Sequence, residues 1–464
     1  MLIFDRMLTS TLRIRLVILF ITQMFSVFAI AQQSPKCGFD KTVQSVIARN
    51  LAFADTFKAV KAGTRHITQS AAKNTAGAGN PVIPVVFHVV LTQAQLNTIG
   101  GEQGVRQRID SQLAVINRDF NARNPDSTLI KGGFKALFGN AGISFALAHT
   151  APDGSATPGY EIVITTKTGF DLDGGWGSGF GFSGVKYSAG GGINAWDAES
   201  YLNIWIFNPL EDGKATNILG LAIPTYIATE KNGISPVERG ITLHYGAFGK
   251  RGSATEYYVP GSDMGRTLTH ETGHYFDMVH IWGDDDGKCP TNDGDDDGIE
   301  DTPPQAYSSS GCSIYPKYDA CTKTGDGIMY QNYMDYSRDN CLLLFTHGQV
   351  AKMKQTLLPG GDTYPLTQHP WLLSYPDPAN PLQANDFTIY PNPADDVLNI
   401  VFRKQAEGLK SVFITDMTGR YIAGSEYDRQ SAFYTFDVGA LYAGVYFVVL
   451  DFDSGKEVRK VFIR

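Results

Sequence analysis

The stretch HETGHYFDMVH, residues 270–280, decides the fold that we expect for the surrounding sequence. Residues four positions apart in a helix share one face, so His270 and His274 can direct their imidazole rings at one cation. Glu271 lies next to the first histidine, close enough to contact a water on that cation without being a ligand. A catalytic zinc ion takes three protein ligands and keeps one open position, so His280 is the expected third ligand.

A sharp turn must follow this helix if His280 is to return to the metal. The helix is expected to stop after Phe276, and Asp277 stands where a glycine would adopt the left-handed conformation freely. Aspartate tolerates this conformation at a cost of roughly 1 kcal/mol. Zinc binding is worth on the order of 10 kcal/mol, so we expect the turn to form.

The bulk composition indicates a globular protein with more than one domain. The chain has 464 residues, with 43% hydrophobic and 12% aromatic residues. Its formal net charge is −8 and no basic stripe stands out, which argues against nucleic acid as a partner.

The N-terminus has the pattern of an export signal. Two arginines precede an apolar run that ends in small residues, so residues 1–31 are interpreted as a signal peptide. A membrane anchor is the alternative, but the run is short and polar residues interrupt it. We expect a protein that passes through the periplasm to the cell surface or the medium, without a transmembrane segment once mature.

Composition divides the rest of the chain into four parts. Residues 32–79 are rich in Ala, Lys, Thr and Gly and are interpreted as a detachable leader. Residues 80–369 form the expected main domain. Residues 370–386 carry four prolines and are interpreted as a semi-rigid linker. Residues 387–464 contain short strand patterns separated by turns, which predicts a small β-sandwich.

Several elements of the main domain are predicted by pattern. The β-branched run at 81–91 and the run at 201–208 predict strands, and apolar spacing within 105–124 predicts a helix between them. Thr346 and Gln349 form a capping box, so another helix should begin there.

A glycine-rich segment, residues 174–192, contains a formal G-x-G-x-x-G pattern. A dinucleotide site is rejected because no helical pattern follows the glycines. We interpret the segment as a flexible surface loop.

Five cysteines fit an exported chain. Four of them lie between residues 289 and 341, whereas Cys37 stands alone in the leader. Such clustering favours two disulfides. A zinc knuckle is the alternative, but no C-x-x-C pair is present.

The stretch HETGHYFDMVH, followed at a distance by NYMDYSRDNCLLLFTHGQ, resembles the metzincin metalloproteases, specifically the pappalysin family. Further matching stretches are IPVVFHVV (83–90), VKYSAGGGINAWDAESYLNIWIFN (185–208), GRTLTHETGH (265–274) and DTPPQ (301–305). This resemblance covers residues of about 80–360. It implies an α/β (α+β) catalytic domain with a twisted mixed sheet and an active-site helix, and zinc-dependent endopeptidase activity.

The resemblance also implies roles for individual residues. The three histidines would bind zinc, and Glu271 would act as general base and then general acid in peptide hydrolysis. Met334 would lie in the turn beneath the metal as a hydrophobic support. Tyr336 would lie close to the zinc, where its hydroxyl can stabilise the developing oxyanion.

Cys37 lies in PKCGFD, and a thiolate is a strong zinc ligand. Leaders of similar proteases use such a cysteine to occupy the open metal position. Our hypothesis is a cysteine-switch zymogen that stays latent until residues 32 to about 75 are removed. A free or intermolecular cysteine is the alternative.

In the same family the four clustered cysteines pair first with third and second with fourth. The implied disulfides are Cys289–Cys321 and Cys312–Cys341. Members with an acidic residue just before the last cysteine favour a basic side chain after the cut. Asn340 stands at that position here, with Asp339 beside it, which leaves the preference for arginine open.

An acidic run covers residues 283–305. Within it, Asp293, Asp295, Asp297 and Gly298 match the first half of an EF-hand loop, but Pro304 stands where the final glutamate belongs. Carboxylates this close repel one another unless a cation neutralises them. Similar proteases bind structural calcium just before the DTP segment, which implies Asp297, the Ile299 carbonyl and Asp301 as ligands. A solvated acidic loop is the alternative.

The C-terminal stretches YPNPADDVLNI, DVGALYAGVYFVV and KVFIR resemble the sorting domain of type IX secretion cargo. This resemblance implies the type IX secretion machinery as a partner. A substrate-binding β-sandwich is the alternative.

The sequence thus predicts a secreted, monomeric zinc metalloendopeptidase that acts on proteins or peptides. One alternative is a calcium-dependent surface adhesin with a vestigial zinc site, whose adhesion would survive Glu271→Ala. The other is a thermolysin-like zincin with a downstream glutamate as third ligand, which would retain zinc after His280→Ala.

Overall fold

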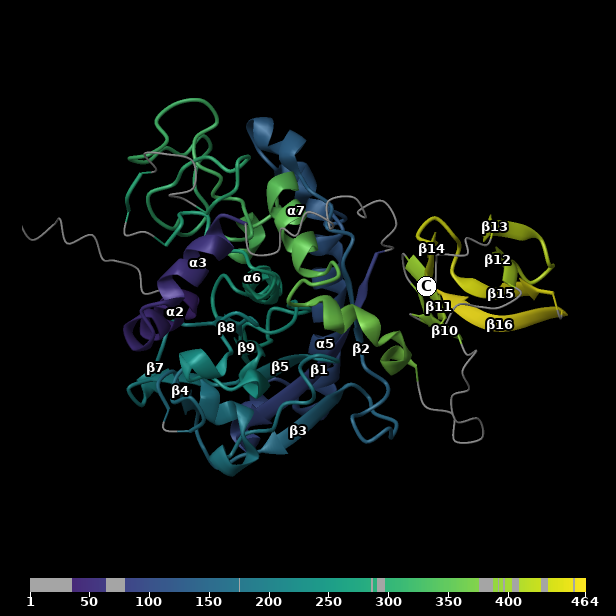
Figure 1. Ribbon diagram of the computed structural model, residues 1–464, viewed down its shortest axis with the longest axis horizontal. Coiled ribbons are helices and arrows are strands. Elements are labelled where there is room, and N and C mark those ends of the chain that lie inside the picture. Colours follow the sequence, from purple (N-terminus) through teal and green to yellow (C-terminus); the bar gives the residue numbers. More distant parts are fainter. Residues whose placement is uncertain are drawn as a thin grey trace, which may run out of the picture. The chain divides into compact units, whose positions relative to one another are not determined.

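A computed structural model (Figure 1) describes the chain from residue 36 onwards, with gaps. The described residues are 36–63, 80–174, 176–284, 287–289, 297–374, 387–390, 392–394, 397–402, 409–426, 433–453 and 455–464. The expected signal peptide and most of the expected linker lie outside these residues. Among the described residues, no helix has both the length and the apolar character that a bilayer crossing requires.

A six-stranded mixed sheet forms the frame of the main domain. Its strands are β1 (Val82–Leu91), β2 (Ser144–Leu147), β3 (Tyr160–Ile164), β5 (Leu202–Phe207), β8 (Gly220–Ile223) and β9 (Gly240–His244). The order is β2-β1-β5-β9-β8, and β3 also pairs with β1. All residues of β1 and β5 are buried, which explains their continuous apolar runs. Both predicted strands are confirmed.

The edge strand β8 differs from its neighbours in direction. It pairs antiparallel with β9, whereas β1, β2, β3, β5 and β9 run parallel to one another. This edge strand contacts the helix Arg266–Tyr275, which contains the first part of the HETGHYFDMVH segment.

The long helix α5 (Gly101–Phe120) and the shorter α6 (Arg266–Tyr275) pack against each other and over the sheet (Figure 1). The guanidinium of Arg266, at the start of α6, forms ion pairs with Asp119 at 3.4 Å and Asp126 at 2.6 Å. A buried ion pair fixes geometry when its partners are well placed, and here it fixes the N-terminus of α6 against α5.

Shorter elements complete the main part of the chain. The other α-helices of the described residues are α2 (Phe39–Arg49), α3 (Phe53–Lys61), α4 (Gln93–Thr98) and α7 (His347–Thr356). The 3-10 helices are η2 (Pro125–Leu129), η3 (Gly132–Leu137), η4 (Ser183–Lys186), η5 (Ser188–Gly190), η6 (Glu230–Asn232), η7 (Pro236–Glu238), η8 (Asp339–Cys341), η9 (Tyr364–Gln368) and η10 (Pro370–Leu373). A small sheet joins β4 (Phe170–Asp171), β6 (Pro209–Glu211) and β7 (Lys214–Ala215). The capping box of Thr346 and Gln349 is present and begins α7, as predicted.

Two expectations need correction. The glycine-rich segment is no flexible surface loop, because Phe180, Phe182 and Val185 are buried in the main core. The start of the expected linker is also part of the fold, since Leu372 and Leu373 in η10 are buried against β1. In both segments the apolar side chains determine the structure, despite the surrounding glycines or prolines.

The C-terminal part is an all-β sandwich, as predicted. One sheet contains β10 (Phe387–Tyr390), β11 (Val397–Phe402) and β14 (Phe433–Asp437). The other contains β12 (Leu409–Thr415), β13 (Tyr421–Glu426), β15 (Gly444–Phe452) and β16 (Gly455–Ile463). The pairings between these strands are antiparallel, and side chains such as Leu398, Val412 and Val448 form a separate core.

Candidate metal centre

The three predicted histidines converge on one buried point. Nε2 of His274 lies 3.2 Å from Nε2 of His270 and 3.1 Å from Nε2 of His280. The opposite ring nitrogens bind the surrounding chain. Nδ1 of His270 contacts the Tyr333 carbonyl at 2.7 Å, and Nδ1 of His274 contacts the Met278 carbonyl at 2.8 Å. An Nδ1–H that donates to a carbonyl leaves the Nε2 lone pair free for a metal.

This geometry fits a zinc ion. Tetrahedral ligands at 2.0–2.1 Å from zinc lie about 3.3–3.4 Å from one another, close to the spacing of these nitrogens. Burial lowers the pKa of His270 to about 3 and that of His274 well below its usual value, so both rings are neutral, as metal ligands must be.

His280 has a different environment. Its Nδ1 lies 2.7 Å from the carboxylate of Asp284 and 3.2 Å from that of Asp40. Burial opposes a charge on this ring, but the two carboxylates outweigh burial and raise the pKa of His280 well above its usual value. The two carboxylates thus favour a positive charge on the His280 ring or on a cation at its Nε2. Carboxylates that contact the far ring nitrogen of a metal-binding histidine have the same effect. Neither Asp40 nor Asp284 was predicted from the spacing of the histidines.

The turn after α6 forms as predicted. Asp277 has φ of +66°, in the left-handed region. Its N–H donates to the His274 carbonyl at 3.1 Å, and the Met278 N–H donates to the Gly273 carbonyl at 3.0 Å. This pair of bonds is the Schellman arrangement that ends many helices. The aspartate therefore replaces glycine without loss of the turn that returns His280.

Aromatic rings and a methionine enclose the histidines. Phe39 stacks on His274 with ring centroids 4.0 Å apart, and Trp282 stacks on His280 at 4.3 Å. Met334 is fully buried, and a Cβ at Gly273 would lie 2.4 Å from its sulfur. The glycine thus lets the turn that contains Met334 approach α6 closely. Neither Phe39 nor Trp282 was predicted from the sequence.

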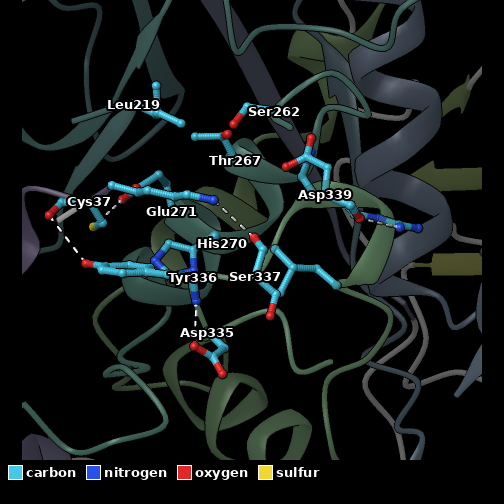
Figure 2. A pocket seen from close by; sticks show the side chains of 13 residues that line it. Cys37, Leu219, Ser262, Thr267, His270, Glu271, Asp335, Tyr336, Ser337 and Asp339 are labelled. Carbon is cyan, nitrogen blue, oxygen red and sulfur yellow. Dashed lines mark hydrogen bonds between the residues drawn. The ribbon is translucent and has the colours of Figure 1, made fainter. Parts of the chain in front are cut away.

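Glu271 and Tyr336 lie beside the cluster (Figure 2). The Glu271 carboxyl is buried, and burial raises its pKa to about 8. A Cβ at Gly220 would lie 2.6 Å from its Oε1, so the edge strand contacts this carboxyl through a glycine. The Tyr336 ring centroid lies 4.9 Å from that of His280. Both predicted catalytic side chains therefore line the same site.

Cys37 occupies the open side of the cluster. Its Sγ and the ligand atoms of the three histidines all lie within 4.8 Å of one another. The same Sγ lies 3.4 Å from Oε2 of Glu271, and the Cys37 carbonyl accepts from the Tyr336 hydroxyl at 3.4 Å (Figure 2). The structure thus places Cys37 next to the three histidines.

Residues 36–38 lie along the edge of the sheet. The Leu219 N–H donates to the Lys36 carbonyl at 2.6 Å, and the Gly38 N–H donates to the Gly220 carbonyl at 3.0 Å. Cys37 and Gly220 form a parallel bridge. Residues 36–38 therefore extend the sheet beyond β8, in the way that an extended peptide adds to a free edge.

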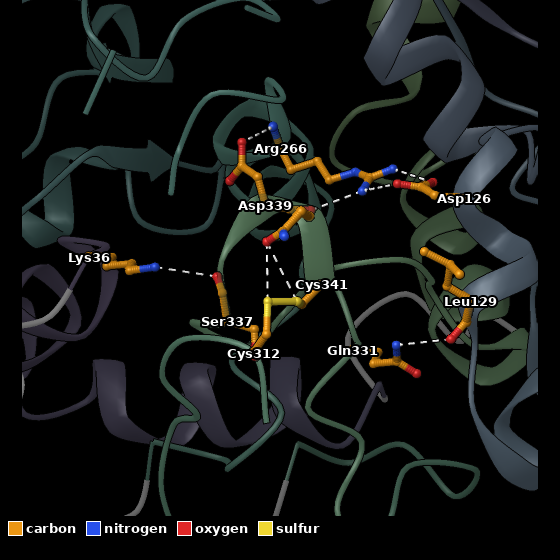
Figure 3. The surroundings of a disulfide bond; sticks show 10 residues. Lys36, Asp126, Leu129, Arg266, Cys312, Gln331, Ser337, Asp339 and Cys341 are labelled. Atoms are coloured by element: carbon orange, nitrogen blue, oxygen red, sulfur yellow. Dashed lines mark hydrogen bonds and ion pairs between the residues drawn. A yellow bond between two sulfur atoms is a disulfide. The ribbon is translucent and has the colours of Figure 1, made fainter. Parts of the chain in front are cut away.

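A small pocket of about 30 Å³ opens next to Glu271 and His270 (Figure 2). Asp339 and Ser337 line it, and the Lys36 ammonium reaches the Ser337 carbonyl at 3.3 Å (Figure 3). Asp339 is buried, with Oδ2 accepting the N–H groups of Met264 and Arg266. Asn340 is exposed instead, and its side chain lies against a disulfide. Asp339 thus lines the pocket together with Glu271 and Asp335, whereas Asn340 does not.

The structure contains two disulfides, Cys289–Cys321 and Cys312–Cys341. This is the pairing that the family resemblance implied. The second bond holds η8, which carries Asp339, to the loop around Cys312 (Figure 3). It thus braces one wall of the pocket.

The predicted calcium ligands accept hydrogen bonds from the chain itself. Asp297 accepts the Ile299 N–H at 2.9 Å and the Thr302 hydroxyl at 2.9 Å. Asp301 accepts the Thr346 hydroxyl at 2.6 Å and the Gly348 N–H at 2.9 Å. Calcium at this loop stays a prediction, and residues 285, 286 and 290–296 of the acidic run lie outside the described residues.

Comparison with known proteins agrees with this site. The model of the pregnancy-associated plasma protein-A peptidase family matches residues 192–358, and that of the secretion system C-terminal sorting domain matches residues 388–464. An extracellular metalloprotease of Arthroderma otae is 29% identical over 247 residues, which are 53% of this chain and 76% of that protein. The extracellular metalloprotease of Arthroderma benhamiae is 43% identical over 104 residues, but this chain spans only 31% of its length.

Two solved structures are also similar. Mature mirolysin of Tannerella forsythia, in complex with a cleaved peptide, is 36% identical, with a TM-score of 0.54, covering 62% of this chain and 96% of that one. A promirolysin variant of the same organism is 33% identical, with a TM-score of 0.58, covering 72% and 97%. The sorting domain and the extracellular relatives support secretion or a cell-surface location. The chain therefore belongs to the pappalysin (pregnancy-associated plasma protein-A) family of metalloproteases and carries a C-terminal secretion sorting domain.

Proposed function

We propose that this protein is a zinc endopeptidase, made as a zymogen that its own leader holds inactive. The observation that carries the proposal is the cluster of three imidazoles with convergent Nε2 atoms beside the buried carboxyl of Glu271. A zinc ion bound there would supply Lewis-acid activation of a water molecule and of the peptide carbonyl.

The side chains of the chain itself have distinct roles in this reaction. Glu271 takes a proton from the attacking water and delivers it to the leaving amine. The Tyr336 hydroxyl, which now donates to the Cys37 carbonyl, donates instead to the oxygen of the cleaved peptide group as it gains negative charge. The rings of Phe39 and Trp282 keep the histidines in place until the leader, which carries Phe39, departs.

Latency follows from the position of Cys37. Its sulfur lies where the fourth zinc ligand belongs, and its backbone occupies the free edge of the sheet. Both water and substrate are excluded while residues 36–38 stay there. Cys37→Ala is expected to show proteolysis before the leader is cleaved, and a variant as latent as the wild type would contradict the switch.

The Asp339 pocket supports a preference for a basic side chain after the cut. Lys36 already lines this pocket, and the negative charges of Asp339 and Asp335 act to raise the pKa of its ammonium against the effect of burial. Cleavage products of a protein substrate should therefore begin with Arg or Lys, and Asp339→Asn should reduce that preference.

The test of the proposed activity is a casein digest by wild-type protein and Glu271→Ala, each after limited proteolysis has removed the leader, and each with and without a zinc chelator. We expect hydrolysis by the wild type alone, abolished by the chelator and restored by zinc. Hydrolysis by Glu271→Ala at the wild-type rate would contradict the proposal. An adhesin with a vestigial site is not favoured, because all three histidines and the glutamate are in place.

The sorting domain supports a second proposal, that the type IX secretion machinery exports the protein. A chain ending near residue 380 should accumulate inside the cell envelope. Normal secretion of that truncated chain would favour a substrate-binding role for the sandwich.

A further inference from the structure

The leader contacts the main domain on both sides of Cys37. Before Cys37 it contacts the pocket that contains Asp339, which is described above. On the other side, α2 covers a hollow of about 440 Å³. The wall that belongs to the main domain consists of Leu172, Asp173, Phe180 and Glu211. We refer to these four residues as the far wall.

Glu211 is held in a defined position on the far wall. It is the last residue of β6, and it pairs with Lys214 of β7. The Thr216 hydroxyl donates to its Oε2 at 3.1 Å, while its Oε1 forms an ion pair with the ammonium of Lys41 from the leader. Asp173 borders the same hollow. Departure of the leader thus removes a cation from a prepared carboxylate that has a second acidic residue nearby.

Phe180 engages a second cation of the leader. The Arg49 guanidinium lies 4.2 Å from the centroid of the Phe180 ring, and its Nη1 donates to the Ser178 carbonyl at 3.0 Å. A cation over an aromatic face is attracted by the negative potential of that face. The far wall therefore holds two cationic side chains by two different kinds of interaction.

The path of the leader relates this wall to a substrate. Residues 36–38 lie along the edge strand, with Lys36 at the Asp339 pocket and α2 following on the other side of Cys37. An extended substrate in the same cleft would have residues on both sides of the metal centre. If the residue after the cut enters the Asp339 pocket, the residues before the cut would lie next to the far wall.

We propose that the far wall, once the leader has left, is a specificity subsite for a basic side chain located before the cut. The inference rests on the proposed endopeptidase function and extends it. The preferred substrates are then polypeptides with basic residues on both sides of the scissile bond, and Glu211 is the specificity-determining residue of the second site.

The test starts from the full-length protein, and limited proteolysis removes its leader before the measurement. It measures kcat/KM for a set of peptides that share one arginine after the cut. One lysine is moved through the four positions before the cut, and each peptide is compared with its glutamine counterpart. Exposed ion pairs are weak, so we expect lysine to raise kcat/KM by about two- to fivefold at one position or more. The advantage should shrink at high salt.

Glu211→Gln should reduce the lysine-to-glutamine ratio to about one. Glu102→Gln, an exposed glutamate on α5, is the matched control and should keep the wild-type ratio. No lysine advantage at any position, or an advantage that persists in Glu211→Gln, would overturn the inference while leaving the proposed function intact. Failure of the wild type to cleave any of the peptides would overturn both.

Discussion

The histidine cluster and the loop around Asp297 both gather ligand-type atoms, but they leave these atoms in different states. At the cluster, the chain binds the Nδ1 atoms while the Nε2 atoms face one another. At the loop, the carboxylates of Asp297 and Asp301 accept N–H and hydroxyl donors of the chain. An oxygen that already accepts hydrogen bonds gains less free energy from binding a cation than a nitrogen lone pair that accepts none. We therefore expect a strong metal requirement at the cluster and a weaker one at the loop.

The largest effect is expected from loss of a cluster ligand. His280→Ala leaves two imidazoles, so zinc affinity should fall by more than the ~100-fold that loss of a supporting partner can cause. His244→Ala, another buried histidine, is the matched control and should retain zinc. The measurement is competition with a chelator, and full zinc retention by His280→Ala would favour a thermolysin-like ligand set.

A smaller effect is expected behind the cluster. Asp284→Asn keeps a side-chain oxygen near Nδ1 of His280 but removes the charge, so zinc affinity should fall by about 10- to 100-fold. Asp301→Asn is the corresponding change at the loop and should leave zinc affinity unchanged. Equal losses of zinc affinity in the two variants would contradict the contrast between the histidine cluster and the loop around Asp297.

The smallest effect concerns the pH dependence of stability at the loop. Burial raises the pKa of Asp297 from 3.8 to about 7, so the folded protein holds a proton there that the unfolded chain has lost. The contribution of this residue to stability is therefore complete below pH 4 and is lost as the pH rises to about 7. Calcium-free Asp297→Asn should lose less stability over this window than the wild type.

Melting temperature between pH 4 and pH 8, in the presence of zinc, measures this difference. Calcium added to the wild type should reduce the pH dependence if it binds the Asp297 carboxylate. Identical profiles of wild type and Asp297→Asn would show that this carboxyl does not titrate as described.

The contrast also shows what sequence can predict. The metal centre was predictable because a helix and one turn set its geometry within eleven residues, and Asp277 could be judged by its own conformational preference. Asp40 and Phe39 escaped prediction because they reach the histidines from the N-terminal part of the chain, across more than two hundred residues. Trp282 and Asp284 are close to His280 in the sequence. They were not predicted because residues that support a metal ligand follow no fixed sequence spacing from it.

Other misreadings have equally specific causes. The glycines of residues 174–192 indicated flexibility, whereas the phenylalanines between them determine the packing. Asp339 and Asn340 are neighbours in η8, and successive side chains of a 3-10 helix point about 120° apart. Only the structure tells which of them faces the pocket.

X-ray absorption at the zinc edge of the purified full chain tests the central claim most directly. We predict one zinc per chain, with three nitrogen ligands at about 2.0–2.1 Å and one sulfur ligand at about 2.3 Å. The sulfur should disappear in Cys37→Ser while the three nitrogens remain. A chain without zinc, or with zinc bound by fewer than three nitrogens, would contradict the account.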